Sequence, residues 1–349
     1  MNLKKRLAAF LFASSALSSL AATAQVAAQP QQPAKISFEN YVVQLKQQAI
    51  AKGFSSELVE QSFKNVTFHK RAVKADKNQP EHVETLETYL PKRVSDWKVD
   101  KAREMLKTHS KELSRIGKQF GVQPRFIVSL WALESNFGKI TGNYSVVSAL
   151  STMAYEGRRE TFFKSQLFDA LTILQQGHIK VENMKGSWAG AMGHNQFMPS
   201  SFLAYAADGD GDGKKDIWNN TSDVFASIAN YLKKVGWNSD ITWARQVQLP
   251  ADFDYSLAIP QKTGGRKPWL THWSRTEMKL ADWNSVGVRK YNGGQLPKVD
   301  IKAAMVFPDG EQGRAYLAYD NYKSLMHWNL SYYFVTSVGH LADRIKFDR

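Results

Sequence analysis

The segment at residues 125–135 constrains the fold most, because it has the length of a helix but almost no polar face. Its apolar side chains point in nearly every helical direction: Phe126, Ile127, Val128, Leu130, Trp131, Ala132 and Leu133. Pro124 suits the first turn of such a helix, and Gly121 suits the end of the helix before it. A helix that is apolar nearly all round has to be buried among other elements. The sequence therefore predicts a helical core built around this segment.

The rest of the chain predicts a mainly helical α+β fold. Amphipathic patterns predict helices at 38–63 (two helices, the second capped by a serine within 54–57), 101–120, 160–177, 223–235 and from 321 to the end. Short apolar runs between turn signals predict strands at 247–249, 305–307 and 315–319. Residues 69–81 are highly charged and predict a turn or extended segment. The segment 261–286 carries Trp269, Trp273 and Trp283, which we expect in the core. The alternative is an additional surface for substrate.

The first 28 residues have the three parts of a secretory signal peptide. Three basic residues precede a short apolar stretch at 7–20, and small residues follow, with cleavage expected near Ala24 or Ala28. The alternative is an uncleaved anchor helix. The chain has no cysteine, which excludes disulfides, a thiolate zinc site, a cysteine nucleophile and a lipidated cysteine. We expect a periplasmic protein without a stable membrane anchor.

The chain is strongly basic, with a formal charge of +14. Cleavage after Ala24 removes three basic residues and leaves +11, because 14 − 3 = 11. Such a charge favours an anionic partner, although solubility alone also explains it. No block of five basic residues exists, so we expect no nucleic-acid binding. An acidic wall polymer fits an exported basic protein better.

Glu134 is the anomalous residue of the buried helix. It shares a helical face with Ile127, Leu130 and Trp131. Burial disfavours the ionised carboxylate, so its pKa should be raised, as a general acid at neutral pH requires. The alternative is a structural glutamate that meets solvent or pairs with a basic residue at the helix end.

Two motifs around Glu134 resemble those of the lytic murein transglycosylases, and more narrowly the family of membrane-bound lytic murein transglycosylase B. They are Glu-Ser-x-x-Gly at 134–138 and Gly-Ala-Met-Gly-x-x-Gln-Phe-Met-Pro-Ser at 190–200. The resemblance runs over most of the mature chain and includes these further segments: 79–81, 229–232, 296–297, 308–310 and 328–331. It implies a lysozyme-like transglycosylase core with a small β insertion.

The resemblance implies cleavage of the β-1,4 bond between N-acetylmuramic acid and N-acetylglucosamine in peptidoglycan strands, with 1,6-anhydro ends and no cofactor for the chemistry. Glu134 would act first as acid and then as base. A two-carboxylate glycosidase needs a second acid about 5–10 Å away, and residues 185–201 contain none. The alternatives are a hydrolytic muramidase and a non-catalytic peptidoglycan-binding scaffold. No protein partner is indicated.

The resemblance also implies substrate contacts from five further residues: Ser187, Gln196, Tyr231, Tyr89 and Asn329. Each could instead be structural. The chain departs from the family at Trp328 and Phe334, where tyrosine is common, and at His194-Asn195, which replace Tyr-Gly. These departures affect single contacts of the cleft more than the reaction.

The loop at 208–223 begins like an EF-hand. Asp208, Asp210 and Asp212 occupy positions 1, 3 and 5, Gly213 follows, and the Lys214 backbone carbonyl would be the next ligand. The resemblance implies that Asp223 closes the site. We expect a structural Ca²⁺, and the alternative is a polar turn without metal.

These patterns give the expected organisation: signal peptide 1–28, linker 29–37, helical catalytic domain 38–245, β-containing subdomain 246–320, and a C-terminal helix 321–349 that completes the cleft.

Overall fold

The computed structural model describes residues 36–77, 84–260 and 264–346. The expected signal peptide, most of the linker and the motif segment 79–81 lie outside the described residues. Phe38–Arg349 form one compact unit.

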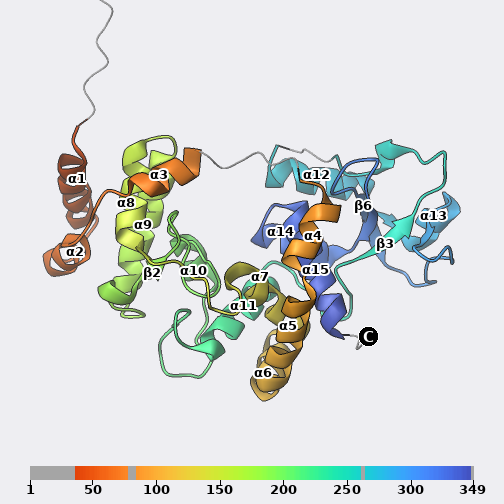
Figure 1. The fold of residues 1–349 in the computed structure, drawn as a ribbon, viewed down its shortest axis with the longest axis horizontal. Coiled ribbons are helices and arrows are strands. Elements are labelled where there is room, and N and C mark those ends of the chain that lie inside the picture. The colour runs from red at the N-terminus through yellow and green to blue at the C-terminus, as the bar shows by residue number, and fades with distance from the viewer. Residues whose placement is uncertain (1–35, 78–83, 261–263, 347–349) are drawn as a thin grey trace, which may run out of the picture. The chain divides into compact units, whose positions relative to one another are not determined.

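Helix α7 (Pro124–Ser135) is the buried centre of this unit. Four helices pack against it: α5 (Asp96–Thr108), α6 (Ser110–Phe120), α11 (Thr221–Lys234) and α15 (Tyr332–Lys346). Figure 1 shows α7 among them. Most of its residues are buried on opposite sides of the helix, including Val128, Leu130 and Trp131. The expectation of a helical core around this segment is confirmed.

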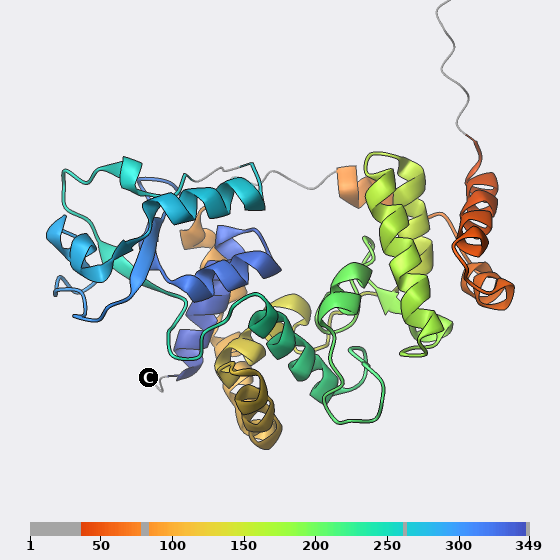
Figure 2. The same cartoon turned by 180° about the vertical axis from the view of Figure 1, so that it is seen from behind.

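The remaining helices belong to the same unit. They are α1 (Phe38–Ala51), α2 (Ser56–Phe63), α3 (Lys70–Lys77), α4 (Leu86–Arg93), α8 (Val146–Glu156), α9 (Glu160–Gln175), α10 (Pro199–Tyr205), α12 (Arg266–Thr276), α13 (Leu280–Ser285) and α14 (Asp320–Trp328), with 3₁₀ turns at Val181–Asn183 and Tyr255–Leu257. Ser55 caps α2 by accepting the amide of Leu58, as predicted. Both views place the α8–α9 pair and the larger sheet on opposite sides of α7 (Figures 1 and 2).

The larger sheet is antiparallel and has the order β4-β6-β7-β3-β5. Its strands are β3 (Ala244–Gln248), β4 (Met278–Lys279), β5 (Arg289–Lys290), β6 (Lys302–Val306) and β7 (Ala315–Ala318). A two-stranded ladder joins β1 (Tyr144–Ser145) to β2 (Lys185–Gly186). The three expected strands correspond to β3, β6 and β7. A second apolar cluster, centred on Trp283, lies under this sheet, and on it we base the proposal of a subdomain at 246–320.

The tryptophans of 261–286 are core residues, as predicted. Trp269 and Trp273 are each 1% exposed and Trp283 is fully buried. Trp269 and Trp273 both stack near Tyr322 of α14, so they join α12 to the helical part. The Trp283 indole donates to the Ala303 carbonyl at 2.8 Å and fixes α13 to β6.

Three expectations about helix boundaries were wrong. The predicted helix at 101–120 is broken at His109, whose ring packs edge-on against Trp131 and Phe225 and turns the chain between α5 and α6. The charged stretch at 69–81 contains helix α3, because the buried Asp76 pairs with Arg158 and Arg159 at its end. The C-terminal helix is interrupted at Asn329, which is extended.

None of the helices in the described part of the chain is long and apolar enough to span a bilayer.

Gly339 tests the packing of α15. A Cβ at this position would lie 2.0 Å from the ring of the buried Trp243. We expect Gly339→Ala to lower the free energy of unfolding by about 1–3 kcal/mol, because two rigid elements must separate. Chemical denaturation measures it, with Gly294→Ala as control, whose Cβ would meet only two side-chain atoms, Asn292 Oδ1 at 3.3 Å and Lys290 Cδ at 3.8 Å. Equal stability of the two variants would contradict this packing.

Candidate active site

Glu134 lies in the last turn of α7, where the chain leaves the helix through a strained bend. Asn136 and Phe137 have φ of 51° and 61°, and Gly138 follows with φ of 80°. The Phe137 ring packs edge-on against Trp131 at 5.5 Å between centroids. Backbone in this region costs energy for residues other than glycine, so the surrounding packing must hold it. The end of α7 and the Glu134 side chain are therefore firmly placed.

The carboxyl group of Glu134 has one hydrogen bond from the described protein. Trp328 Nε1, at the end of α14, donates to its Oε1 at 2.6 Å. Burial raises the pKa of Glu134 to about 7, and the indole N–H lowers it by a smaller amount. No other charged group of the described residues contributes to this shift. With a pKa near 7, about half of the Glu134 carboxyl groups carry a proton at pH 7. The side chain is partly accessible, so a ligand can reach this acid.

Aromatic side chains form the wall behind this carboxyl group. The Trp328 ring lies 4.7 Å from Tyr231 and 5.2 Å from Phe197 between centroids, and Tyr205 lies 4.0 Å from Tyr231. The Tyr231 hydroxyl donates to the His327 carbonyl at 2.7 Å, which fixes α11 to α14. Tyr231 is only 7% exposed, and burial raises its pKa to about 12. This wall keeps Trp328 in place against Glu134.

Ser187 lies in the tight loop after β2. Its hydroxyl oxygen accepts the amides of Ala189 and Ala191 at 3.3 and 3.0 Å, so its own proton remains available to donate. The loop packs close to the chain after α7, since a Cβ on Gly142 would lie 2.1 Å from the Gly186 carbonyl. Gly142 thus allows these two backbone segments to touch.

Gln196 joins the same loop to the segment after α7. Its Nε2 donates to the carbonyls of Thr141 and Gly193 at 3.1 and 2.8 Å, and its backbone has φ of 49°. These two bonds to backbone carbonyls orient the side-chain amide. The Gln196 Oε1 atom is then the group that can accept a hydrogen bond from a ligand.

Tyr89 and Asn329 lie on the other elements near the site. The Tyr89 ring on α4 packs 5.3 Å from Tyr333 and has the Arg93 guanidinium 5.2 Å from its centroid. Asn329 is exposed and directly follows Trp328. Within the described residues, neither side chain hydrogen-bonds to Glu134. Trp328, by contrast, donates its indole N–H directly to Glu134.

The sequence missed the contact made by Trp328 and the role of His194. His194 Nδ1 accepts from the Trp131 indole at 3.1 Å, and a Cβ on Gly138 would overlap the His194 ring at 2.2 Å. The sequence marked both residues only as departures from the family. That was the one available signal, because the contacts join positions 63 and 194 residues apart.

The acidic loop brings three carboxylates together. Oxygens of Asp208, Asp210 and Asp212 lie within 4.8 Å of one another. Asp208 also accepts the amides of Gly211 and Gly213, which fold the loop around it. Such a set of hard oxygen donors fits Ca²⁺.

Asp223 is not part of this group of three. It is fully buried, and its oxygens accept the amides of Gly209 and Asp216 at 2.7 and 2.6 Å. Burial raises its pKa to about 6. Asp223 therefore ties the two ends of the loop together. Lys214 donates its amide to Asp212, and its carbonyl remains a candidate ligand.

The loop is anchored to the segment that carries Ser187 and Gln196. The Trp218 indole donates to the Lys185 carbonyl at 2.8 Å, and the His194 amide donates to the Ile217 carbonyl at 2.9 Å. These two hydrogen bonds connect the 208–223 loop to the segment that forms the cleft wall.

Comparison with known proteins places this geometry in a family. The transglycosylase SLT domain family matches residues 37–343. Membrane-bound lytic murein transglycosylase B of Escherichia coli is 38% identical over 126 residues, which are 36% of this chain and 35% of that protein. The aligned part thus spans about a third of that relative.

Two solved structures extend the likeness. SltB3 from Pseudomonas aeruginosa, in complex with NAG-anhNAM-pentapeptide, has a TM-score of 0.82 and 38% identity, covering 89% of this chain and 80% of that chain. Escherichia coli Slt35, in complex with calcium, has a TM-score of 0.72 and 23% identity, covering 88% and 92%, and shows the fold alone. The fold is accordingly α+β, predominantly helical, with the lysozyme-like core of these proteins. The chain belongs to the transglycosylase SLT domain family, and its relatives there are lytic murein transglycosylases.

Proposed function

We propose that this chain is a lytic transglycosylase that cleaves the β-1,4 bond between N-acetylmuramic acid and N-acetylglucosamine in peptidoglycan and leaves 1,6-anhydromuramic acid ends. The observation that carries the proposal is the Glu134 carboxyl group, whose pKa burial raises to about 7 at the end of α7. About half of such groups carry a proton at pH 7, and this protonated form can donate to a leaving oxygen.

The reaction needs one carboxyl group used twice. Glu134 donates its proton to the glycosidic oxygen as the bond from that oxygen to C1 of the muramyl ring breaks. The resulting carboxylate then accepts the proton of the C6 hydroxyl while O6 bonds to C1. The acid is regenerated, no water is consumed, and the two products together have the composition of the substrate.

A second catalytic carboxylate is not supported. No other acidic group of the described residues perturbs the pKa of Glu134. Residues 185–201 contain neither aspartate nor glutamate. Two carboxylates about 5–10 Å apart are the usual arrangement for hydrolysis. Residues 185–201 supply no second carboxylate, which favours attack on C1 by the C6 hydroxyl of the same sugar over attack by water.

Five residues are proposed to bind the glycan strand. Ser187 has a hydroxyl proton to donate and Gln196 an amide oxygen to accept, and both suit hydroxyl or acetamido groups. Tyr89 offers an aromatic face, and Tyr231 supports the aromatic wall. Asn329 is exposed beside Trp328 and can reach a sugar in the cleft.

Two further proposals concern the setting of the enzyme. A structural Ca²⁺ would bind Asp208, Asp210, Asp212 and the Lys214 carbonyl, with Asp223 closing the loop behind them; the fold relative Slt35 has a structure in complex with calcium. A periplasmic location beside an anionic polymer is the second proposal, and the signal-like N-terminus and the charge of +14 support it.

Glu134→Gln tests the acid. We expect it to lower the rate of muropeptide release from purified sacculi by about 100- to 10,000-fold, because the amide cannot donate and recover the proton. Mass analysis of the wild-type products should show species one water lighter than muramidase products. The exposed Glu182→Gln is the control. Products with reducing ends, or a fully active Glu134→Gln variant, would refute the proposal.

The Trp328–Glu134 hydrogen bond predicts a pH effect. Activity needs protonated Glu134, so kcat/KM should fall as pH rises through about 7. Trp328→Phe removes a bond that favours the carboxylate, so the pKa should rise and the fall should move about one unit higher. Trp218→Phe, which loses a bond to a backbone carbonyl instead, should leave the profile unchanged. If kcat/KM of Trp328→Phe falls at the same pH as that of the wild-type protein, the Trp328 hydrogen bond does not lower the pKa of Glu134.

Calcium binding predicts a shift in thermal stability. Adding CaCl₂ to the chelator-treated protein should raise Tm, since the ion binds the folded loop. Asp210→Asn should lose most of this rise, whereas the exposed Asp252→Asn should keep it. The same Tm with calcium and with chelator would contradict a metal site.

A further inference from the structure

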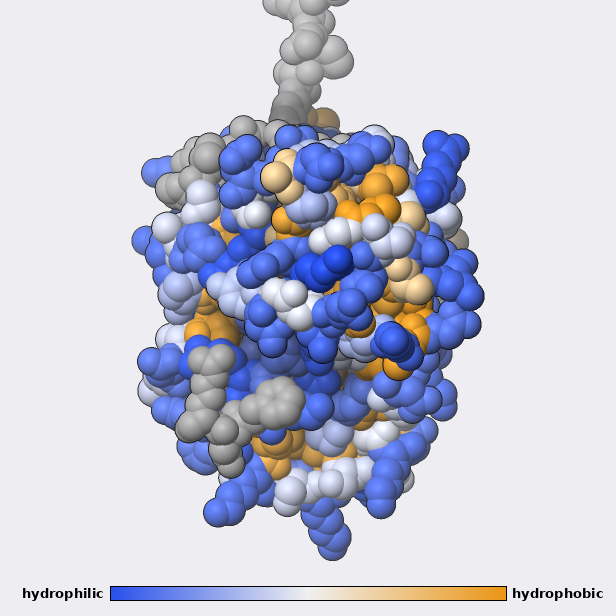
Figure 3. Space-filling view, turned by 90° about the vertical axis from the view of Figure 1, so that its right-hand side faces the viewer, coloured by the Kyte–Doolittle hydropathy of each residue, from blue (hydrophilic) through white to orange (hydrophobic). Residues whose placement is uncertain are grey.

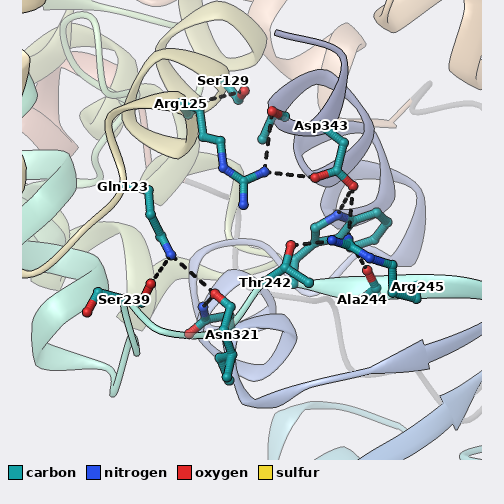
Figure 4. A network of polar contacts seen from close by, with 12 residues as sticks. Gln123, Arg125, Ser129, Ser239, Thr242, Ala244, Arg245, Asn321 and Asp343 are labelled. Carbon is teal, nitrogen blue, oxygen red and sulfur yellow. Dashed lines mark hydrogen bonds and ion pairs between the residues drawn. The ribbon is translucent and has the colours of Figure 1, made fainter. Parts of the chain in front are cut away.

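A cavity of about 860 Å³ lies away from Glu134, where the first turn of α7 meets β3, β5 and the end of α15. Its polar side is formed by Gln123, Arg125, Arg245 and their neighbours, whose polar contacts Figure 4 shows. Its other side is formed by the segments around Leu280 and 296–301. The volume lies within the range of small-ligand sites and is far larger than a single inorganic anion needs.

The polar side has an excess of positive charge. Arg125 and Arg245 share one carboxylate, Asp343, which accepts Nη1 of Arg125 at 2.8 Å and Nη1 of Arg245 at 3.3 Å. The Trp243 indole also donates to Asp343 at 3.0 Å, so the position of that carboxylate is fixed (Figure 4). Lys290 and Lys346 line the same cavity, and Asp240 is its one acidic lining residue.

The two guanidinium groups keep donors for a ligand. Within the described residues, only Nη1 of Arg125 and of Arg245 donates to protein, although each guanidinium has five N–H bonds. The Arg125 side chain is 12% exposed and that of Arg245 is 48% exposed. A carboxylate that enters the cavity can therefore receive charge-assisted bonds from a partly desolvated pair.

The opposite side is apolar. Val247, Leu280, Leu296 and Ile301 line it, and Val299 is exposed at its edge. Figure 3 shows the face at this end of the unit as mostly hydrophilic, with separate apolar patches. A ligand that fits both sides carries a carboxylate next to small apolar groups. Asp240 adds a place for one ammonium group.

We propose that this cavity binds the peptide part of peptidoglycan, with the carboxylate of a D-alanine-terminated stem peptide on Arg125 and Arg245 and its methyl groups on the apolar side. The proposal rests on peptidoglycan being the substrate, as proposed above, but it concerns a site separate from the cleft. The cavity and Glu134 lie at opposite ends of α7, nine residues or about 13 Å apart along the helix axis. A stem peptide bound here would hold the polymer to the enzyme independently of the glycan in the cleft.

The test uses the mature chain and the peptide Nα-acetyl-L-lysyl-D-alanyl-D-alanine, followed by isothermal titration calorimetry. Amidation of its C-terminus should weaken binding about tenfold, because the guanidinium pair loses its carboxylate. Arg245→Gln should weaken binding by a similar factor. The control is Lys302→Gln, which removes one charge from the same sheet outside the cavity and should bind like wild type. Glu134→Gln should also bind the peptide normally.

The outcomes separate this site from the cleft reaction. Equal affinity for acid and amide in the wild-type protein overturns the proposal, and this comparison needs no folded variant. Equal affinity for the all-L peptide overturns the assignment to stem peptides. Loss of binding in Glu134→Gln alone would place the peptide in the cleft and likewise overturns it. If the peptide binds as expected but sacculi yield no anhydro products, the binding site stands and the proposed reaction fails.

Discussion

The burial of α7 is the constraint on which the rest of the structure depends. Because this helix has no polar face, four other helices must pack around it, and they come from segments before and after it in the chain. A carboxyl group near its end is therefore carried into an apolar environment by the packing itself. The raised pKa of Glu134 is a consequence of the same burial that stabilises the fold. In this protein the packing that forms the core also raises the pKa of the acid.

The break in the C-terminal helices at Asn329 gives that acid its hydrogen-bond partner from the described part of the chain. If α14 and α15 were continuous, helical geometry would fix the direction of the chain after Trp328. The extended residue instead ends α14 at Trp328, whose indole N–H meets Glu134. An indole can only donate, so the hydrogen-bonded oxygen is kept as an acceptor and the proton is left for the other oxygen. Tyr231 and Phe197 support this orientation from behind.

Backbone contacts connect the remaining parts to the same centre. The acidic loop reaches the cleft through Trp218 and the amide of His194, and His194 in turn accepts from Trp131 on α7. At the other end of α7, Arg125 is bonded to Asp343 of α15. Both ends of the central helix thus contact elements that carry charged clusters. This arrangement explains how a metal loop and a cationic cavity can both be positioned relative to Glu134.

Local patterns were enough to predict much of this protein. Apolar periodicity predicted α7, α9 and α11, turn signals predicted the strands β3, β6 and β7, and the apolar stripe around Glu134 predicted a raised pKa. These features depend on neighbours within a few residues. The breaks at His109 and Asn329 depend on ring packing and hydrogen bonds with distant segments. The helix propensity of neighbouring residues carries no information about such contacts.

The sequence by itself determined the buried helix, the acid on it and the acidic loop, because side-chain type and spacing suffice for these. Only the tertiary structure decided that Trp328 bonds to Glu134, that Asp223 ties the loop ends, and that Arg125 and Arg245 meet around Asp343. The members of each contact are separated by many residues in the chain. Their meeting is fixed by how whole helices and strands pack, which is a property of the complete core.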